Sequence, residues 1–246
     1  ENVCVKAPGS DRFLLIGANL RAEPGDIIGI VGPSGAGKTT LVRMIAGAAA
    51  PDVGAVRIDG AKLTDWQPDK LGPFIGYLPQ DVALFAGTIG ENISRFDKAD
   101  RDQVHAKIVD AARAAGVHEL IRTLPQGYDT EIGRNGRGLS AGQAQRIGLA
   151  RALYGDPVLL ALDEPNAHLD SDGENALVNA LRAASARGAC TFVVAHRAGF
   201  MSIANKLLFM RDGRVEMYGP RDQVMAKMTP GPRPVAAPGE ASEARS

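Results

Sequence analysis

The stretch Asp26-Ile-Ile-Gly-Ile-Val-Gly-Pro-Ser-Gly-Ala-Gly-Lys-Thr-Thr40 joins a short apolar run to a glycine-rich loop. The run Ile27–Val31 is continuously apolar, which is typical of a strand buried on both faces. The pattern Lys38–Ala46 predicts a helix directly after the loop. A strand, a loop of the form G-x-x-x-x-G-K-T and a helix, in this order, predict a phosphate-binding loop in an α/β domain.

The chemistry of this loop follows from its glycines and its lysine. Glycines let the backbone curl so that successive N–H groups point at phosphate oxygens, and the helix adds its positive N-terminal end. We expect Lys38 to contact the β- and γ-phosphates, and Thr39 to offer its hydroxyl to Mg²⁺. A glycine turn with an incidental lysine fits the flanking strand and helix less well. The loop residues predicted to bind nucleotide are Gly32, Pro33, Ser34, Gly35, Ala36, Gly37, Lys38, Thr39 and Thr40.

A second apolar run ends in two acids, Val158-Leu-Leu-Ala-Leu-Asp163-Glu164. This pattern predicts a buried strand with a carboxylate at its C-terminal end, where ligands collect in parallel sheets. We expect Asp163 to hold Mg²⁺ through water, and Glu164 to face the γ-phosphate and polarise the attacking water. The alternative is an acid that only caps a surface turn, and the upstream Lys38 argues against it.

Two more polar residues follow predicted strands. His196 ends the strand Thr191–Ala195, which follows a crossover helix over Glu174–Ala186. This order implies parallel pairing, so His196 can donate a hydrogen bond to the γ-phosphate or to the water. Gln80 follows the strand Phe74–Leu78, and we expect it to reach both Mg²⁺ and the water. Taken alone, each would be interpreted as a polar residue at a strand end.

The segment Leu139-Ser-Ala-Gly-Gln143 precedes another helical pattern, Ala141–Tyr154. Ser140 can cap this helix and Gly142 leaves its backbone accessible, so the helix N-terminus suits a phosphate. The glycine-rich loop already supplies one phosphate site, and a second is redundant unless it serves another nucleotide. We therefore expect Ser140, Gly142 and Gln143 to contact a second nucleotide. The simpler alternative is a capped helix without a ligand.

Composition narrows the class of protein. The 246 residues include 28 Lys and Arg and 28 Asp and Glu, so the net charge is zero and nucleic acid is not the expected partner. Cys4 and Cys190 are too few and too far apart for a disulfide framework, and the apolar run after Cys190 predicts a buried thiol. No stretch approaches the roughly 20 apolar residues that span a bilayer. Because the chain opens at Glu1 without an initiator methionine, we expect it to be part of a longer polypeptide.

The remaining pattern predicts an α/β core with a helical insertion over residues 86–155. The core and its insertion would occupy residues 1–228, and the Pro- and Ala-rich residues 229–246 are predicted to be disordered. Strands are predicted around Val3 and Val5 and over Phe13–Leu20 and Ala55–Ile58, and a hairpin over Lys206–Arg211 and Arg214–Tyr218. Within the insertion, helices are predicted over Gly87–Arg95, Arg101–Ala115 and His118–Thr123.

Together these motifs resemble the nucleotide-binding domain of ABC transporters, over about residues 1–228. The resemblance implies a P-loop NTPase of the ABC type: an α/β fold with a mixed core sheet, an N-terminal antiparallel β-subdomain and an inserted α-helical subdomain. It implies ATP hydrolysis with Mg²⁺, in which Lys38, Gln80, Glu164 and His196 act in catalysis and Thr39, Gln80 and Asp163 hold the metal.

The family also implies a head-to-tail homodimer. Two ATP molecules would lie between the phosphate loop of one copy and the Leu139–Gln143 segment of the other. In this resemblance Gln80 matches the Q-loop, Asn166–Asp170 the D-loop and His196 the switch histidine. The Q-loop and the helical subdomain couple to membrane-embedded helices in this family.

Three segments are similar to bacterial type I secretion exporters of the protease and lipase class, namely Leu78–Phe85, Gly87–Ile93 and Glu164–Asp170. This resemblance implies export of unfolded polypeptides and a membrane-spanning domain in the same full-length chain. It places the domain at the cytoplasmic face of the bacterial inner membrane. It also implies a periplasmic adaptor and an outer-membrane channel as partners.

The chain departs from the family pattern at several positions. Ala7 stands where many members have an aromatic ring that stacks on adenine, and Pro8 and Phe13 are the candidates to replace that ring. Ala141 replaces the first glycine of the usual Leu-Ser-Gly-Gly-Gln. Arg134 stands where exporters often carry a glutamate that touches the membrane domain. These departures predict weaker adenine binding or altered coupling.

Two alternative functions remain open from the sequence. The first is a soluble ABC-type ATPase acting on DNA or ribosomes. Such proteins carry long coiled-coil inserts or two such domains, and this chain has neither. The second is a regulatory ATP-binding domain with little turnover. The intact Glu164 and His196 argue against it, whereas Ala7 and Ala141 keep it open. His168, within the D-loop, is a further departure from the family pattern.

Overall fold

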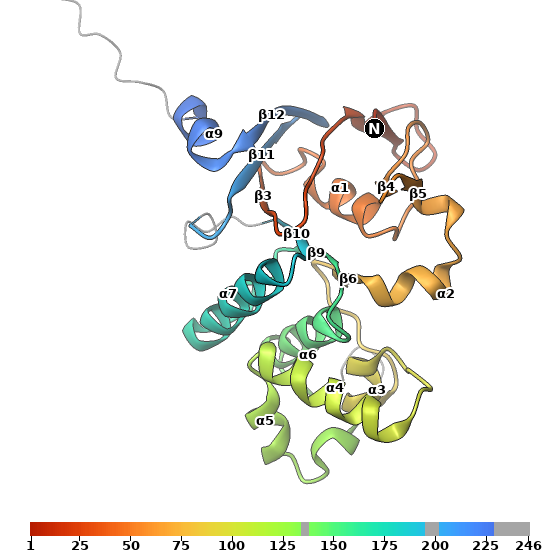
Figure 1. Cartoon of the computed structure of the whole chain (residues 1–246), viewed down its shortest axis with the longest axis vertical. Helices are drawn as coiled ribbons and strands as arrows, with labels where there is room; N and C mark the ends of the chain where they lie inside the picture. Colours follow the sequence, from red (N-terminus) through yellow and green to blue (C-terminus); the bar gives the residue numbers. More distant parts are fainter. Residues whose placement is uncertain (134–137, 195–201, 229–246) are drawn as a thin grey trace, which may run out of the picture.

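The computed structural model describes residues 1–133, 138–194 and 202–228. At its centre is a six-stranded sheet in the order β12-β11-β3-β10-β9-β6 (Figure 1). All neighbours pair in parallel except β11 and β12, which form an antiparallel hairpin. The mixed sheet confirms the predicted fold class. Its strands are β3 (Ile27–Val31), β6 (Ile75–Leu78), β9 (Leu159–Asp163), β10 (Cys190–Val194), β11 (Lys206–Arg211) and β12 (Arg214–Pro220).

Helix α1 (Lys38–Ile45) covers one face of this sheet. Its apolar side, which includes Leu41 and Val42, packs with Ile28 and Ile30 of β3. The N-terminal strands β1 (Val3–Lys6) and β2 (Phe13–Ala18) form an antiparallel pair that belongs to the same apolar cluster. Two short elements, β4 (Arg57–Ile58) and β5 (Ala61–Lys62), pair beside them, and α2 (Pro68–Leu71) leads back to β6.

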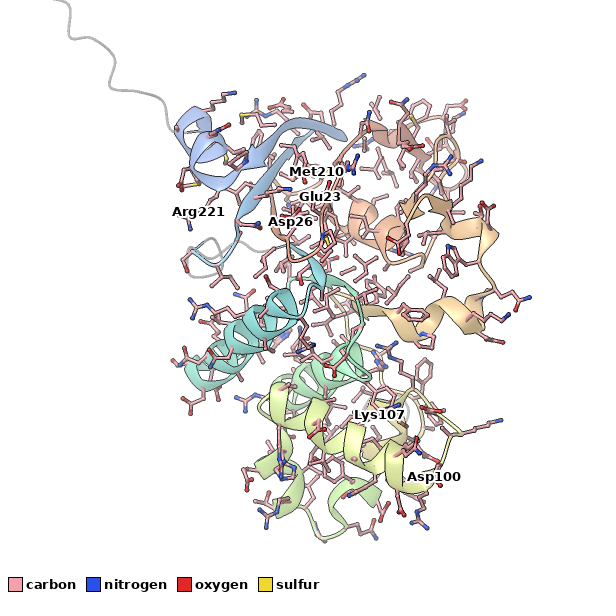
Figure 2. The ribbon with its side chains drawn as sticks, viewed as in Figure 1. Glu23, Asp26, Asp100, Lys107, Met210 and Arg221 are labelled. Carbon is pink, nitrogen blue, oxygen red and sulfur yellow. The ribbon has the colours of Figure 1, made fainter. Side chains whose placement is uncertain are left out.

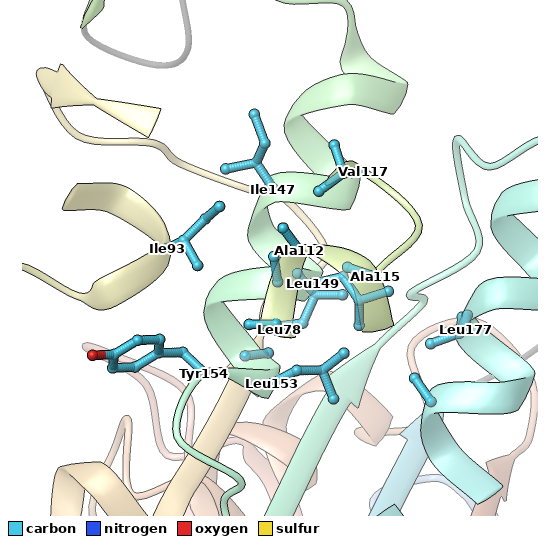
Figure 3. Close-up of a cluster of buried hydrophobic side chains, with 14 of the residues drawn as sticks. Leu78, Ile93, Ala112, Ala115, Val117, Ile147, Leu149, Leu153, Tyr154 and Leu177 are labelled. Carbon is cyan, nitrogen blue, oxygen red and sulfur yellow. The ribbon is translucent and has the colours of Figure 1, made fainter. Parts of the chain in front are cut away.

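Helices α6 (Ala141–Leu153) and α7 (Ser171–Ala186) cover the opposite face. Leu160 and Leu162 of β9 join the cluster on this face, whereas Leu159 and Ala161 join the cluster under α1, as the alternation of a strand requires. Figure 3 shows Leu149 and Leu153 of α6 beside Leu78 of β6 in this cluster. The insertion adds α3 (Ile89–Ser94), α4 (Arg101–Ala114) and α5 (His118–Thr123), which form the lower lobe in Figure 1.

Several element boundaries differ from the prediction, and three of the differences have a clear structural reason. Gly87 and Thr88 are not helical; they form β7, which pairs with β8 (Glu131–Ile132), and Thr88 caps α3 through a capping box. The strand expected over Ala55–Ile58 is only Arg57–Ile58, because Ala55 hydrogen-bonds to the chain start instead. Helix α7 begins earlier than expected because Asp170 accepts a hydrogen bond from Gly173 and caps it.

The predicted C-terminal hairpin is confirmed and is followed by α9 (Arg221–Met228). Near the start of β3, the buried Asp26 accepts hydrogen bonds from Asn205 at 2.9 Å and Lys206 at 2.6 Å, which ties this end of β3 to β11 (Figure 2). Cys190, predicted to be a buried thiol, is only partly buried, and this burial raises the pKa of its thiol to about 12. None of the helices in the described ranges has the length and apolar character of a membrane span. The expected tail, residues 229–246, lies outside the described residues.

Candidate nucleotide-binding and catalytic site

The site is built at the edge of the sheet where its parallel strands end. Val194 of β10 pairs with Ile30 of β3 on one side and with Asp163 of β9 on the other. Ile30 and Asp163 are therefore level with each other across the sheet. The two segments that leave the sheet just beyond them begin at Gly32 and Glu164. The phosphate loop and the acidic pair, Asp163 and Glu164, therefore lie at the same edge of the sheet, with β10 between their strands.

The next strand brings the Q-loop glutamine to the same edge. Leu78 of β6 pairs with Leu162 of β9, so Gln80 leaves the sheet level with Glu164. The Gln80 side chain is exposed at this edge. His196 follows β10 by two positions but lies outside the described residues, and its role stays a prediction.

Close packing of the phosphate loop requires two of its glycines. A Cβ atom at Gly32, where φ is +150°, would lie 2.1 Å from the carbonyl oxygen of Met210 on β11. A Cβ atom at Gly37, where φ is +95°, would lie 2.7 Å from the carbonyl oxygen of Leu14 on β2. Both obstacles are backbone atoms of neighbouring strands, and Figure 2 labels Met210. The loop therefore keeps its curled shape because it is pressed between β2 and β11.

Lys38 lies inside this loop rather than in solvent. Its residue is 7% exposed, and its Nζ donates to the carbonyl oxygens of Gly32 and Pro33, each at 2.9 Å. Helix α1 starts at Gly37, which has no side chain to cap the first N–H groups. A cation and the N-terminus of a helix therefore face the same small space, which suits a phosphate.

The acidic pair sits in an unusual environment. Asp163 is fully buried at the end of β9, and burial together with the charge of Asp163 raises the pKa of Tyr77 on β6. Glu164 has φ +50°, a left-handed conformation that costs a non-glycine residue about 1–2 kcal/mol. Such strain is held where the surrounding structure fixes it, commonly at functional sites. The sequence contained no sign of this backbone geometry.

The segment Leu139–Gln143 forms the predicted capped helix start. Ser140 Oγ accepts from the Gln143 amide at 3.2 Å, and Gln143 Oε1 accepts from the Ser140 amide at 2.8 Å, which is a capping box. Gly142 has a second reason to lack a side chain: a Cβ there would lie 2.8 Å from the carbonyl oxygen of His168. The helix start thus packs directly on the segment Asn166–Asp170.

The two predicted phosphate-binding segments are followed by helices that pack on opposite faces of the sheet. Helix α1, which follows the phosphate loop, packs in the apolar cluster on one face, and α6, which follows Ser140, packs in the cluster on the other. Figure 1 shows α1 above the sheet and α6 below it. The two predicted phosphate sites therefore precede helices of two different layers.

A profile described as ABC transporter matches residues 15–167, which span the phosphate loop, Ser140 and the acidic pair. The chain belongs to the ABC transporter family. ATP-binding domains of this family hydrolyse ATP, and the activity of this ABC domain is ATP hydrolysis. The predicted resemblance to ABC transporters is therefore confirmed.

Relatives of the ABC domain include several exporters. The chain is 47% identical to the type I secretion system ATP-binding protein PrsD of Rhizobium meliloti (strain 1021), over 93% of this chain and 39% of the relative. It is 36% identical to an ATP-dependent lipid A-core flippase of Cupriavidus pinatubonensis, over 92% of this chain and 38% of the relative. It is also similar to a bacterial Atm1-family ABC exporter with ATP bound, with a TM-score of 0.81 and 34% identity over 93% of this chain and 39% of that one. The chain thus spans about two fifths of each.

Gln145, a buried polar residue of the ABC domain, was not among the predicted site residues. Gln145 on α6 is 2% exposed, and its Nε2 donates to the carbonyl oxygen of Pro165 at 3.2 Å. A signal was present, because Gln145 is a polar residue on the side of α6 that also carries the buried Leu149 and Ala152. The predicted phosphate-binding segment ends at Gln143 and so does not include Gln145.

The ABC domain also has a pocket at the junction of its helical lobe and the core sheet. The pocket has a volume of about 370 Å³. Phe85 and Phe96 are 61% and 41% exposed, and their ring centroids lie 6.2 Å apart. The Arg151 guanidinium lies 5.9 Å from the centre of the Phe85 ring. The pocket is lined by Tyr77, Pro79, Ala83, Phe85, Asn92, Arg95, Phe96 and Arg151.

Proposed function

We propose that this ABC domain is the motor of a bacterial type I secretion exporter that moves polypeptides across the envelope. The observation that carries this proposal is the 47% identity with PrsD along 93% of the chain. In the proposal, a membrane-spanning domain belongs to the same full-length protein, and the ABC domain lies at the cytoplasmic face of the inner membrane. A periplasmic adaptor and an outer-membrane channel complete the export path.

We further propose that ATP is bound with Mg²⁺ at the edge of the sheet. The donor set fits this cation, because carboxylate, hydroxyl and amide oxygens are ligands that Mg²⁺ accepts. Asp163 is a fully buried carboxylate level with the start of the phosphate loop, and Thr39 and Gln80 complete the set. Bound Mg²⁺ would neutralise charge on the phosphates. Lys38 would release its loop carbonyls and donate to the β- and γ-phosphates.

In the proposed mechanism, hydrolysis depends on water held in line with the γ-phosphate. Glu164 leaves the sheet at the same edge as the phosphate loop, where its carboxylate would accept a proton from that water. Gln80, level with Glu164, would orient the water from the other side. His196 would donate a hydrogen bond to the γ-phosphate, as predicted from its position after β10.

The opposite placement of α1 and α6 supports a site shared by two chains. Ser140 and Gly142 would contact the γ-phosphate of a nucleotide held by the partner's phosphate loop. The resulting homodimer is head-to-tail and encloses two ATP molecules. Closure on ATP and opening after hydrolysis would then move the attached membrane domain.

The pocket beside Phe85 is the proposed docking site for a helix of the membrane domain. Its wall includes Pro79 and Ala83, which flank Gln80 in the chain, and its two exposed phenylalanine rings offer apolar surface. The positive charges of Arg95 and Arg151 at its wall would attract the C-terminus of a docked helix or an acidic side chain on it. A movement of this helix would therefore shift Gln80, which lies at the same edge of the sheet as Glu164.

The exporter assignment is tested by exchanging domains. The matching domain of PrsD is replaced by this chain, and in parallel the matching domain of the lipid A-core flippase is replaced by it. We expect the PrsD chimera to support secretion of that system's own protein and to hydrolyse ATP. If the PrsD chimera inserts and hydrolyses ATP but secretes nothing, while the flippase chimera functions, the type I assignment is wrong.

A further inference from the structure

Gln145 is a buried polar side chain that the proposed hydrolysis mechanism does not use. It lies on α6 and is 2% exposed, and Ile147 and Leu149 beside it belong to the large apolar cluster. A buried amide is costly unless it forms hydrogen bonds. Its partners therefore indicate what it does.

The side-chain amide of Gln145 contacts the backbone carbonyl groups of Glu164 and Pro165. Its Nε2 lies 3.2 Å from the carbonyl oxygen of Pro165 and, in a longer and weaker contact, 3.5 Å from that of Glu164. Over the described ranges, no backbone N–H donates to the Pro165 carbonyl. The Ala167 amide also donates to the Glu164 carbonyl at 3.1 Å. The Gln145 amide thus fixes the peptide groups on the C-terminal side of Glu164.

Glu164 needs such support because its backbone is strained. Its φ of +50° is unusual for a residue with a side chain, and strained geometries persist only where neighbours hold them. On the opposite side, the Glu164 amide donates to the carbonyl oxygen of Val194 at 3.1 Å. Strand β10 and helix α6 therefore clamp Glu164 from two directions, which sets the direction in which its carboxylate leaves the backbone.

We propose that Gln145 is a positioning residue for Glu164. It does not touch ATP; it holds the peptide groups after Glu164 so that the carboxylate points at the attacking water. The inference rests on the proposed role of Glu164 in polarising that water. Because catalysis depends on sub-ångström placement of reacting groups, losing the Gln145 amide lowers kcat and leaves nucleotide affinity unchanged.

The first test removes the amide and keeps the shape. Gln145→Met retains the chain length and suits the apolar surroundings but cannot donate. We expect kcat for ATP hydrolysis to fall about tenfold or more, with the Kd for a fluorescent ATP analogue and Mg²⁺ within about twofold of the unchanged chain. Gln103→Met, at an exposed position of α4, is the control and keeps full kcat. A kcat within about twofold of normal, or equal losses of kcat and affinity, overturns the proposal.

The second test uses pH and also covers failure of Gln145→Met to fold. In Gln145→Glu, the protonated carboxyl can donate to the Pro165 carbonyl, but the ionised carboxylate cannot. Burial disfavours the charge and raises the pKa of the new carboxyl. We therefore expect the ratio of variant to normal kcat to be highest at low pH and to fall as pH rises through that pKa. A ratio that stays constant with pH overturns the proposal.

Glu164→Gln on the otherwise unchanged chain separates this inference from the proposed function. If Glu164→Gln stops hydrolysis while both Gln145 variants keep full kcat, only the positioning role is wrong. If Glu164→Gln keeps normal turnover, the assigned role of Glu164 is wrong and the positioning role fails with it.

Discussion

The guanidinium of Arg95 donates to the carbonyl oxygen of Ile75 at 2.9 Å, and so joins the end of α3 to the first residue of β6. The same group donates to the carbonyl oxygens of Gly72 at 2.8 Å, Arg151 at 3.0 Å and Ala152 at 3.2 Å. One side chain therefore connects the helical lobe, through α3 and α6, to the edge strand of the core sheet. It does this at the wall of the pocket beside Phe85.

Arg95→Ala is expected to destabilise the fold. The substitution removes the charged donor of four carbonyl groups, although the Gly72 carbonyl keeps the Ile75 amide as a donor. Hydrogen bonds from charged groups contribute about 1.5–3 kcal/mol each. The contributions of neighbouring bonds do not add. We expect the free energy of unfolding, measured by urea titration, to fall by about 3 kcal/mol. The exposed Lys98→Ala is the control, with a change below about 0.5 kcal/mol. Equal effects of the two variants would show that Arg95 contributes no more than a surface charge.

Glu164→Gln is expected to abolish steady-state ATP hydrolysis while preserving ATP binding. The amide cannot accept the proton of the attacking water, but it occupies the same space as the carboxylate. Phosphate release and equilibrium binding of a fluorescent ATP analogue are measured in parallel. Normal turnover in this variant would remove Glu164 from the mechanism.

Specific activity should rise with protein concentration. The reason is that, in the proposed homodimer, a complete site combines Lys38 of one copy with Ser140 of the other. Hydrolysis per molecule is measured from nanomolar to micromolar concentrations of the chain, with the oligomeric state followed by light scattering. Activity per molecule that stays flat down to nanomolar protein would argue against a shared site.

Weak discrimination between ATP and GTP is expected because Ala7 offers no ring to the base. Ala7 is half-buried in the turn between β1 and β2, and its amide donates to the Arg12 carbonyl at 2.8 Å. We expect Ala7→Tyr to tighten ATP binding about two- to tenfold in competition assays, the range of one aromatic stacking contact. A strong ATP preference in the unchanged chain would mean that another group reads adenine. Phe13, 41% exposed with the Lys6 ammonium 5.5 Å from its ring centroid, is then the residue to replace by Ala.

Ala141→Gly should strengthen the ATP-bound dimer. Ala141 is exposed at the first position of α6, where its methyl group would face the partner's nucleotide. Removing the methyl is expected to raise both hydrolysis and ATP-dependent dimerisation several-fold. Ala106→Gly, exposed on α4, reports the cost of a helical glycine alone, roughly 0.5–1 kcal/mol. An Ala141→Gly variant that neither hydrolyses faster nor dimerises better would show that the methyl is harmless.

Much of the site could be predicted because its signals are local. The phosphate loop is a spacing of glycines and a lysine between a strand and a helix, and the capping box at Ser140 and Gln143 joins residues three positions apart. The run before Asp163 indicated a buried strand because parallel strands are covered on both faces. Each of these features depends on neighbours in the chain, which a sequence displays directly.

Only the tertiary structure decided which side chains hold the site together. Two contacts join α6 to the loop after β9: Gly142 packs against the His168 carbonyl, and the Gln145 side chain donates to the Pro165 carbonyl. The left-handed backbone at Glu164 lies in the same loop. The placement of α1 and α6 on opposite faces likewise follows from packing of the whole sheet. A sequence states which residues can hydrogen-bond, but the distances between remote segments exist only once the chain has folded around its core.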